Sequence, residues 1–428
     1  MTYDLIAAIA TAEGRGGVAI VRASGAGALG LARNMFSHRG EYLPNMLYAG
    51  EIDGGSFKDY GMCVYFRAPK SYTGEDTVEF HCHGGREIAR GILRRALDLG
   101  ARMADRGEFT KRAYLNGKLS LSAAEGVADM IDAESEAQVR AGYSLYTEKL
   151  TNEGKRLQGV LLECLAGIDA DLDYPEEDLT ADTRTQTREK LVCVQEALAA
   201  LLKQYRAGKK LKSGVSVALC GNPNAGKSSL FNALLGSDRA IVSATAGTTR
   251  DVVEGAIELN GVLFRLIDTA GLRESGDEIE REGIRRAERA IESADLILYL
   301  KEEENLSFPA GTPVITVGAK SDLGRSDRGC DVYLSARTGE GLDRLKEMMY
   351  EKGYGRESDV CLLEERHYRS VSESYEAVGE ALTAVMNAPV ELYAEDVKRA
   401  WVALGTLSGE TASEAVVNEI FEKFCVGK

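Results

Sequence analysis

The sequence has 428 residues, of which 44% are hydrophobic and 28% are charged, a composition typical of folded globular proteins. At roughly 150 residues per domain, this length predicts about three domains and excludes a single small module. The formal net charge of −15 makes the whole molecule repel nucleic acid. An RNA partner must therefore be met by a local basic patch or through another protein.

Two further features bear on location. No apolar run approaches the ~18 residues that span a bilayer, and the first residues include Asp4 instead of a basic segment. The eight cysteines contain no CxxC pair, which fits reduced thiols better than a disulfide framework. We expect an unexported, cytoplasmic protein.

The first 118 residues predict a mixed α+β domain, with strand candidates at 17–25, 62–68 and 77–83 between glycine-rich turns. Residues 85–118 then carry nine Lys or Arg against four Asp or Glu. A solvated helix face is the plainer interpretation of this basic segment, and an anion site is the alternative.

Helical patterns lie on both sides of a segment with a different residue pattern. Apolar residues recur every three or four positions from 157 to 168, and similar turn-free patterns cover 186–206 and 364–387. Between them, after a basic linker at 208–214, strand candidates at 215–221, 263–271, 294–300, 312–320 and 331–336 alternate with helical stretches. The order predicts an α/β domain inserted into a helical bundle made from two chain segments.

A phosphate-binding loop opens this α/β segment. Gly221 to Ser229 reads GNPNAGKSS, which fits GxxxxGK[ST] after a strand and before a helix. The backbone N–H groups of such a loop, including those of Asn224, Ala225, Gly226 and Ser229, turn toward phosphate oxygens. Lys227 neutralises the β and γ phosphates, and Ser228 supplies a hydroxyl to Mg²⁺.

Two switch-like elements follow in order. Thr248 and Thr249 lie in a polar loop, where Thr249 is placed to close on Mg²⁺ and the γ-phosphate. Asp268 and Gly271 end the next strand and offer a carboxylate for the Mg²⁺ shell and an N–H for the γ-phosphate. The three elements together predict a nucleotide-hydrolysing domain.

The base-contacting segment favours GTP over ATP. Asp322 is placed to accept from the N1 and N2 donors of guanine, and Lys320 to lie along the ring. Ser335 and Ala336, followed by Arg337, resemble the last base-contacting loop of guanine GTPases. Those GTPases carry Asn where Ala319 stands, so we expect weaker base affinity and a weaker tie to the phosphate loop.

No glutamine follows the strand that ends at Asp268 to orient the catalytic water. Leu272 stands where Ras-like enzymes place the glutamine that orients the attacking water. The acidic run from Glu274 to Glu280 offers candidates, although by charge alone such a run is more often a solvated helix start.

Over essentially its whole length the chain resembles the MnmE (TrmE) family of tRNA-modifying GTPases. Beyond the GTPase elements, the resemblance rests on the segments at 14–25, 71–85, 107–133, 171–178, 268–284 and 424–428. It implies a folate-binding, dimerising domain at 1–118, a helical domain at 119–212 and 356–428, and a Ras-like GTPase domain at 213–355. The implied reaction couples GTP hydrolysis to adding an aminomethyl-type group at carbon 5 of the wobble uridine of certain tRNAs. A tetrahydrofolate derivative gives the carbon, and the implied partner is a flavin-dependent MnmG subunit.

The resemblance also assigns roles to residues. GTPase domains of the family dimerise around K⁺, for which Asn224 matches the phosphate-loop ligand and Ser243, Thr245 and Thr248 match the surrounding loop. Ser228 and Thr249 match Mg²⁺ ligands, and Glu280 matches the glutamate that positions water. The residues that match folate contacts are Arg22, Glu79, Lys118 and Lys428. Cys425 matches a candidate chemical cysteine, for which a buried helix cysteine is the plainer alternative.

Two rival functions stay open at this point. A GTPase switch or assembly factor that binds RNA without modifying it would share the GTPase motifs, but it predicts a basic RNA-binding appendage. A one-carbon transferase with a degenerate GTPase domain is compatible with Ala319, but Lys227, Thr249, Asp268 and Glu280 are present.

Overall fold

The computed structural model describes residues 4–12, 14–173, 181–222, 224–237, 255–268, 288–301, 308–324, 329–355, 364–409 and 413–428. These residues belong to two compact units. Unit 1 contains Met1–Ala128, Tyr146–Arg156 and Leu404–Lys428, and unit 2 contains Asp129–Leu145 and Leu157–Ala403. None of the helices in the described ranges combines the length and the apolar character needed to cross a membrane.

A six-stranded sheet forms the centre of unit 1, with the strand order β3-β4-β5-β2-β1-β6. Neighbouring strands are antiparallel except β1 and β6, which pair in parallel. The strands are β1 (Ile6–Ile9), β2 (Val18–Ser24), β3 (Leu47–Asp53), β4 (Lys58–Phe66), β5 (Thr77–His83) and β6 (Arg102–Met103). The candidates at 17–25 and 77–83 are confirmed as β2 and β5, and the candidate at 62–68 is the second half of β4.

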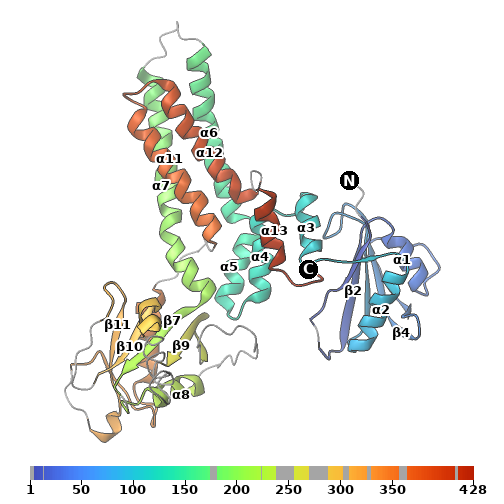
Figure 1. The fold of residues 1–428 in the computed structure, drawn as a ribbon, viewed down its shortest axis with the longest axis horizontal. Helices are drawn as coiled ribbons and strands as arrows, with labels where there is room; N and C mark the ends of the chain where they lie inside the picture. Colours follow the sequence, from blue (N-terminus) through green and yellow to red (C-terminus); the bar gives the residue numbers. More distant parts are fainter. Residues whose placement is uncertain are drawn as a thin grey trace, which may run out of the picture. The chain divides into compact units, whose positions relative to one another are not determined.

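Two helices cover one face of this sheet, α1 (Ala28–Met35) and α2 (Arg86–Asp98) (Figure 1). Alternate residues of the strands, such as Val21 and Phe80, pack with Ile92 of α2 in one apolar core. Because successive strand residues point to opposite faces, the residues between them lie on the other face of the sheet. That face carries Arg22 of β2, opposite Glu79 of β5.

A small helical cluster completes unit 1. Its helices are α3 (Glu108–Leu115), the first part of α4 (Leu121–Asp132) and α13 (Glu414–Glu422). Leu121 packs with Phe421 and Phe424 in a second core. The chain after α13 then forms an isolated antiparallel bridge between Arg106 and Val426. The last residues therefore lie on the N-terminal part of the same unit.

The second sheet, in unit 2, has the order β12-β11-β10-β7-β9-β8. Its strands are parallel except the β8–β9 pair, as expected for strands that alternate with helices. The elements are β7 (Val215–Gly221), α8 (Lys227–Ser237), β8 (Gly255–Leu259), β9 (Val262–Asp268), β10 (Leu296–Leu300), β11 (Val314–Gly318), β12 (Val332–Tyr333) and α10 (Leu342–Met349). The five predicted strands are confirmed, and β8 is an additional antiparallel edge strand.

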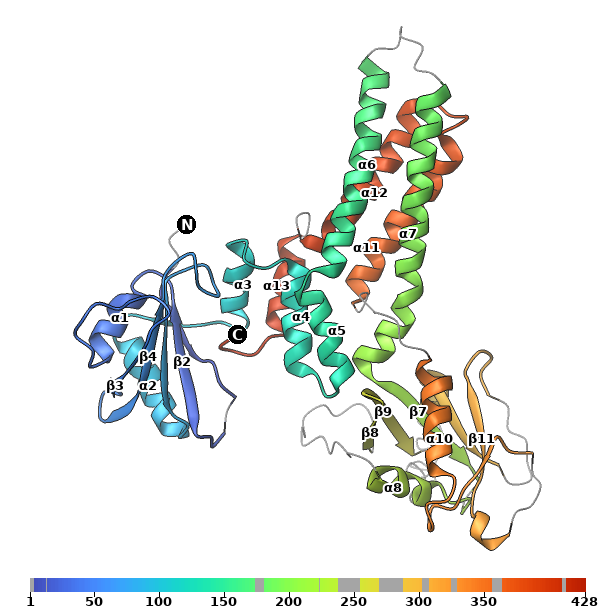
Figure 2. The same cartoon turned by 180° about the vertical axis from the view of Figure 1, so that it is seen from behind.

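Long helices flank this sheet in sequence. They are α5 (Glu136–Tyr146), α6 (Lys149–Asp173), α7 (Ala181–Ser213), α11 (Glu365–Ala384) and α12 (Val390–Ser408). Helices α7 and α11, which precede and follow the sheet in the chain, pack against each other (Figure 2). Their pairing confirms the predicted fold class, in which a Ras-like α/β domain is inserted into a discontinuous helical bundle. Helix α7 stops at Gly214, whose φ of +79° is the left-handed value that commonly ends a helix.

Candidate functional site

The phosphate loop joins the carboxyl end of β7 to the amino end of α8. Its backbone takes positive φ values at Asn224 (+63°) and Gly226 (+103°). A Cβ atom on Gly221 would approach the carbonyl oxygen of Leu300 to 2.7 Å, so this position accepts only glycine. The sequence therefore folds locally into a turn whose N–H groups meet at a helix N-terminus, which is an anion-binding arrangement.

Lys227 is held inside this loop. Its side chain is 6% exposed, and its ammonium donates to the carbonyl oxygens of Gly221 and Asn222, both at 2.8 Å. These two carbonyls place the positive charge at the centre of the loop. An ammonium in this position neutralises phosphate oxygens bound by the surrounding N–H groups.

Ser228 and Asp268 meet at the start of α8. The Ser228 hydroxyl donates to Oδ2 of Asp268 at 3.1 Å, and Asp268 is 3% exposed at the end of β9. The parallel pairing of β7 with β9 brings the two elements together, since Leu219 lies opposite Asp268. A hydroxyl and a carboxylate are hard oxygen donors, and this donor set fits Mg²⁺.

The predicted base-contacting segments also come together. The Ser335 hydroxyl donates to Oδ1 of Asp322 at 2.9 Å, and Nε of Arg337 lies 3.7 Å from Oδ2 of the same carboxylate. Lys320 takes a left-handed φ of +60°, and its ammonium donates to the carbonyl oxygen of Asn224 at 2.7 Å. The base segment is thereby linked to the phosphate loop.

The remaining loop residues are placed as follows. Ala225 is buried, Ser229 is exposed in the first turn of α8, and Ala336 is half-buried beside Ser335. Apart from Asn224 and Asp268, the residues predicted for the switches, the potassium site and water positioning lie outside the described residues. They are Ser243, Thr245, Thr248, Thr249, Gly271 and Glu280.

In unit 1, Arg22 and Glu79 form an ion pair on the face of the sheet opposite the helices. Nε of Arg22 lies 2.7 Å from Oε1 of Glu79, and Nε2 of His81 lies 3.2 Å from Oε2. Burial raises the pKa of Glu79, but the contacts with His81 and Arg22 outweigh it and hold that pKa below its usual value. Glu79 is thus a carboxylate engaged through both oxygens.

Aromatic rings surround the Arg22 guanidinium. Its carbon lies 5.7 Å from the ring centre of Tyr72 and 5.6 Å from that of Phe109. The N–H of Phe109 donates to the carbonyl oxygen of Lys428 at 3.2 Å. Arg22 and the backbone of Lys428 therefore both lie against Phe109. The Lys118 ammonium donates to the carbonyl oxygen of Pro69 at 3.0 Å, in the loop that precedes Tyr72.

Cys425 is exposed in the segment after α13, and its carbonyl oxygen accepts from the N–H of Gly107 at 3.3 Å. The alternative of a buried helix cysteine is therefore wrong.

Arg112 shows where the interpretation of the basic segment fails. This residue is 3% exposed and pairs with Asp4, Glu75 and Glu108 at 2.8, 3.2 and 2.8 Å. Arg112 is therefore an exception within the segment, whereas Arg86, Arg90 and Arg94 of α2 are exposed, as a solvated helix face predicts. His81 was not predicted as the partner of Glu79, although the two-residue spacing on a strand places both on one face of the sheet.

Comparisons with known proteins agree along the chain. A family model described as the MnmE helical domain matches residues 121–425, and one described as the GTP-binding protein TrmE N-terminus matches residues 5–118. The tRNA modification GTPase MnmE of Azoarcus sp. (strain BH72) is 39% identical over an alignment of 446 positions, which covers 99% of this chain and 98% of that protein. The protein of the same name from Laribacter hongkongensis (strain HLHK9) is 40% identical over 446 residues, covering 99% of both. Among solved structures, the G domain of the T. maritima FeoB iron transporter is 30% identical, covering 32% of this chain and 98% of that chain, with a TM-score of 0.24.

Proposed function

This chain belongs to the MnmE family of tRNA modification GTPases, and we propose that it hydrolyses GTP to drive modification of tRNA. The observation that carries the proposal is the phosphate loop, in which Lys227 is held by two loop carbonyls beside the Ser228–Asp268 pair. We further propose the domain limits 1–118, 119–212, 213–355 and 356–428.

The described residues support separate roles for the phosphate loop and the base segment in binding GTP. Loop N–H groups and Lys227 bind the phosphates, while Asp322, held by Ser335, accepts from the guanine edge. Ser228 and Thr249 would hold Mg²⁺, with Asp268 in its outer shell. Mg²⁺ in such a site neutralises charge on the β and γ phosphates.

Hydrolysis requires residues of the switch segments. We assign Glu280 to orient the attacking water, Gly271 and Thr249 to contact the γ-phosphate, and Thr248 to contact both nucleotide and cation. Asn224, Ser243, Thr245 and Thr248 would hold K⁺ when two GTPase domains dimerise. K⁺ there supplies the positive charge that an arginine supplies in other GTPases.

In unit 1 we propose a site for a tetrahydrofolate derivative similar to 5-formyl-tetrahydrofolate. Glu79 offers a carboxylate to the amide and amino edge of a pterin, and Arg22, Lys118 and Lys428 offer positive charge to formyl and glutamyl oxygens. The pairing of Arg22 with Glu79, and the position of Lys428 beside Phe109, support this assignment.

The product we propose is an aminomethyl-type group at carbon 5 of the wobble uridine, made with a flavin-dependent MnmG-type partner and a homodimer of this chain. The net charge of −15 supports a partner that carries much of the tRNA-binding surface. Exposure of Cys425 supports a role for it as a reactive thiol, because such a thiol must be accessible. A cytoplasmic location stays a prediction.

The test is turnover of GTP and ATP by the purified protein in KCl and in NaCl. We expect GTP-selective turnover that needs K⁺ and falls at least ~100-fold in Glu280→Ala, as for loss of a group that activates water. Glu278→Ala, from the same acidic run, is the matched control and should keep its turnover. Turnover indifferent to K⁺, or equal use of ATP, would contradict the mechanism. GTPase activity without any tRNA modification alongside the partner would favour the RNA-binding switch.

A further inference from the structure

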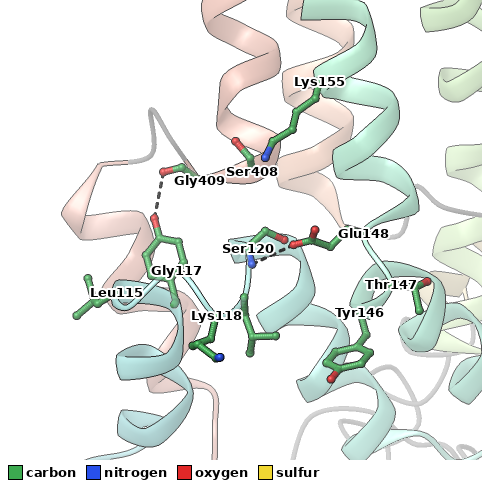
Figure 3. Close-up of a pocket in the computed structure, with 12 residues that line it drawn as sticks. Leu115, Gly117, Lys118, Ser120, Tyr146, Thr147, Glu148, Lys155, Ser408 and Gly409 are labelled. Atoms are coloured by element: carbon green, nitrogen blue, oxygen red, sulfur yellow. Dashed lines mark hydrogen bonds between the residues drawn. The ribbon is translucent and has the colours of Figure 1, made fainter. Parts of the chain in front are cut away.

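Unit 1 contains a cavity of about 740 Å³ between three separate chain segments. Its walls are the link from α3 to α4, the turn from α5 to α6, and the end of α12 (Figure 3). A volume in this range is typical of small-molecule sites.

The charge of the cavity favours an anion. Among the described residues that line it, Lys118 and Lys155 carry positive charge and Glu148 carries negative charge. Glu148 accepts from the N–H of Ser120 at 3.2 Å, which holds it at the N-terminus of α4. Helix α6 also begins at this cavity, so two positive helix ends add to the two ammonium groups.

The remaining polar groups suit carboxylates. The hydroxyl-bearing side chains of Ser120, Tyr146, Thr147 and Ser408 line the walls, and Figure 3 shows Lys155 reaching from α6 toward Ser408. The Ser408 hydroxyl already donates to the carbonyl oxygen of Gly405, so the two ammonium groups are the donors that match a flexible ligand with more than one carboxylate.

Lys118 connects this cavity to the proposed folate site. Its ammonium donates one hydrogen bond to Pro69 and has three donors in all, so it can also meet a ligand. The end of a folate away from its pterin carries glutamate, which cells extend through γ-linked glutamyl residues. We propose that the cavity receives this oligoglutamyl tail, with Lys118 and Lys155 pairing with its carboxylates. The inference rests on the proposed binding of folate.

The experiment compares 5-formyl-tetrahydrofolate as monoglutamate and as triglutamate, by calorimetry on the full chain. We expect the triglutamate to bind roughly tenfold more tightly, the gain typical of one charge-assisted contact. In Lys155→Met the two affinities should come within about twofold of each other. Lys149→Met, an exposed lysine on the same helix outside the cavity, is the matched control and should keep the preference.

A second variant tests the sign of the charge effect. Glu148→Gln keeps an acceptor for the Ser120 N–H but removes the negative charge, so triglutamate should bind more tightly than to the wild type. Equal affinities of the wild type for the two folates, or a preference that survives in Lys155→Met, would overturn the tail site while leaving folate binding intact. Failure of the wild type to bind even the monoglutamate would instead overturn the folate proposal itself.

Discussion

The ammonium group of Lys320 donates a hydrogen bond to the carbonyl oxygen of Asn224, 2.7 Å away. Lys320 lies in the segment proposed to contact guanine, and Asn224 lies in the phosphate loop. The sequence predicts a weaker link, because Ala319 stands where guanine GTPases carry asparagine. The lysine provides one link between the two loops, although Ala319 has no amide of its own.

Restoring the amide should therefore strengthen nucleotide binding. A Cβ on Gly226 would lie 3.8 Å from that of Ala319, so side chain 319 faces the phosphate loop. We expect Ala319→Asn to tighten GDP and GTP binding about fivefold, the effect of one net hydrogen bond, as measured with a fluorescent nucleotide. Ala310→Asn, at an exposed alanine outside the proposed nucleotide-binding segments, is the control. Unchanged affinity in Ala319→Asn would show that Lys320 already supplies the whole link.

The docking of the last residues depends on Gly427. This residue has a φ of +98°, and a Cβ there would approach the carbonyl oxygen of Ile9 to 2.2 Å. We expect Gly427→Ala to displace the segment 425–428, to speed hydrogen exchange at Phe109, and to lower affinity for 5-formyl-tetrahydrofolate at least fivefold. The segment holds Lys428 beside Phe109, which is why affinity should fall.

Gly100→Ala is the matched control for that variant. Gly100 has nearly the same φ, +99°, but a Cβ there meets no atom within 4 Å. It therefore reproduces the backbone strain without the steric clash. Equal loss of folate affinity in both variants would contradict a specific role for the docked segment.

Arg112 should be a major stabilising residue of unit 1. Removing a buried cation that leaves a carboxylate uncompensated typically costs about 3–5 kcal/mol. Glu75 would lose the guanidinium that lies 3.2 Å from it, whereas Glu108 keeps its pair with Arg102. We expect Arg112→Leu to lower the free energy of opening of β1 and α3 by about that amount, measured by hydrogen exchange. Arg90→Leu breaks an exposed pair with Glu87 and should cost less than about 1 kcal/mol. Similar small losses in both variants would disprove the cluster's importance.

The same unit should lose stability in acid. Burial raises the pKa of Glu108, but hydrogen bonds from Arg102, the Asp105 N–H and Arg112 outweigh it and leave that pKa below 4.5. Hydrogen bonding to Arg102 likewise lowers the pKa of Asp4 below 3.8. The unfolded chain binds these protons more readily, so stability is full above the unfolded pKa values and falls as pH drops through the folded ones.

We therefore expect the hydrogen-exchange stability of unit 1 to be constant from pH 7 to about 5 and to decline below about 4.5. Glu108→Gln should flatten part of that decline and lower stability at pH 7. A decline of the same size in the variant would show that other carboxylates dominate.

Some features followed from sequence because the determining residues are close together in the chain. The phosphate loop lies within nine residues, so its glycines and Lys227 were predictable from spacing, and the structure places them as expected. Alternation predicted β2 and β5, and a three-to-four residue period predicted the long helices. The packing of α11 against α7 was also predictable from the sequence, because the segments on either side of the inserted sheet share the same apolar period.

Other features depend on contacts between distant residues. Neither the bond from Lys320 to Asn224 nor the burial of Arg112 among Asp4, Glu75 and Glu108 can be inferred from local spacing. The strands β1, β3, β6 and β8 were missed, because their conformation is stabilised by neighbouring strands more than by their own side chains. Local residue patterns thus specify the loops and helices of this protein, whereas the Arg112 ion pairs and the lysine-lined cavity arise only when folding brings residues from distant parts of the chain together.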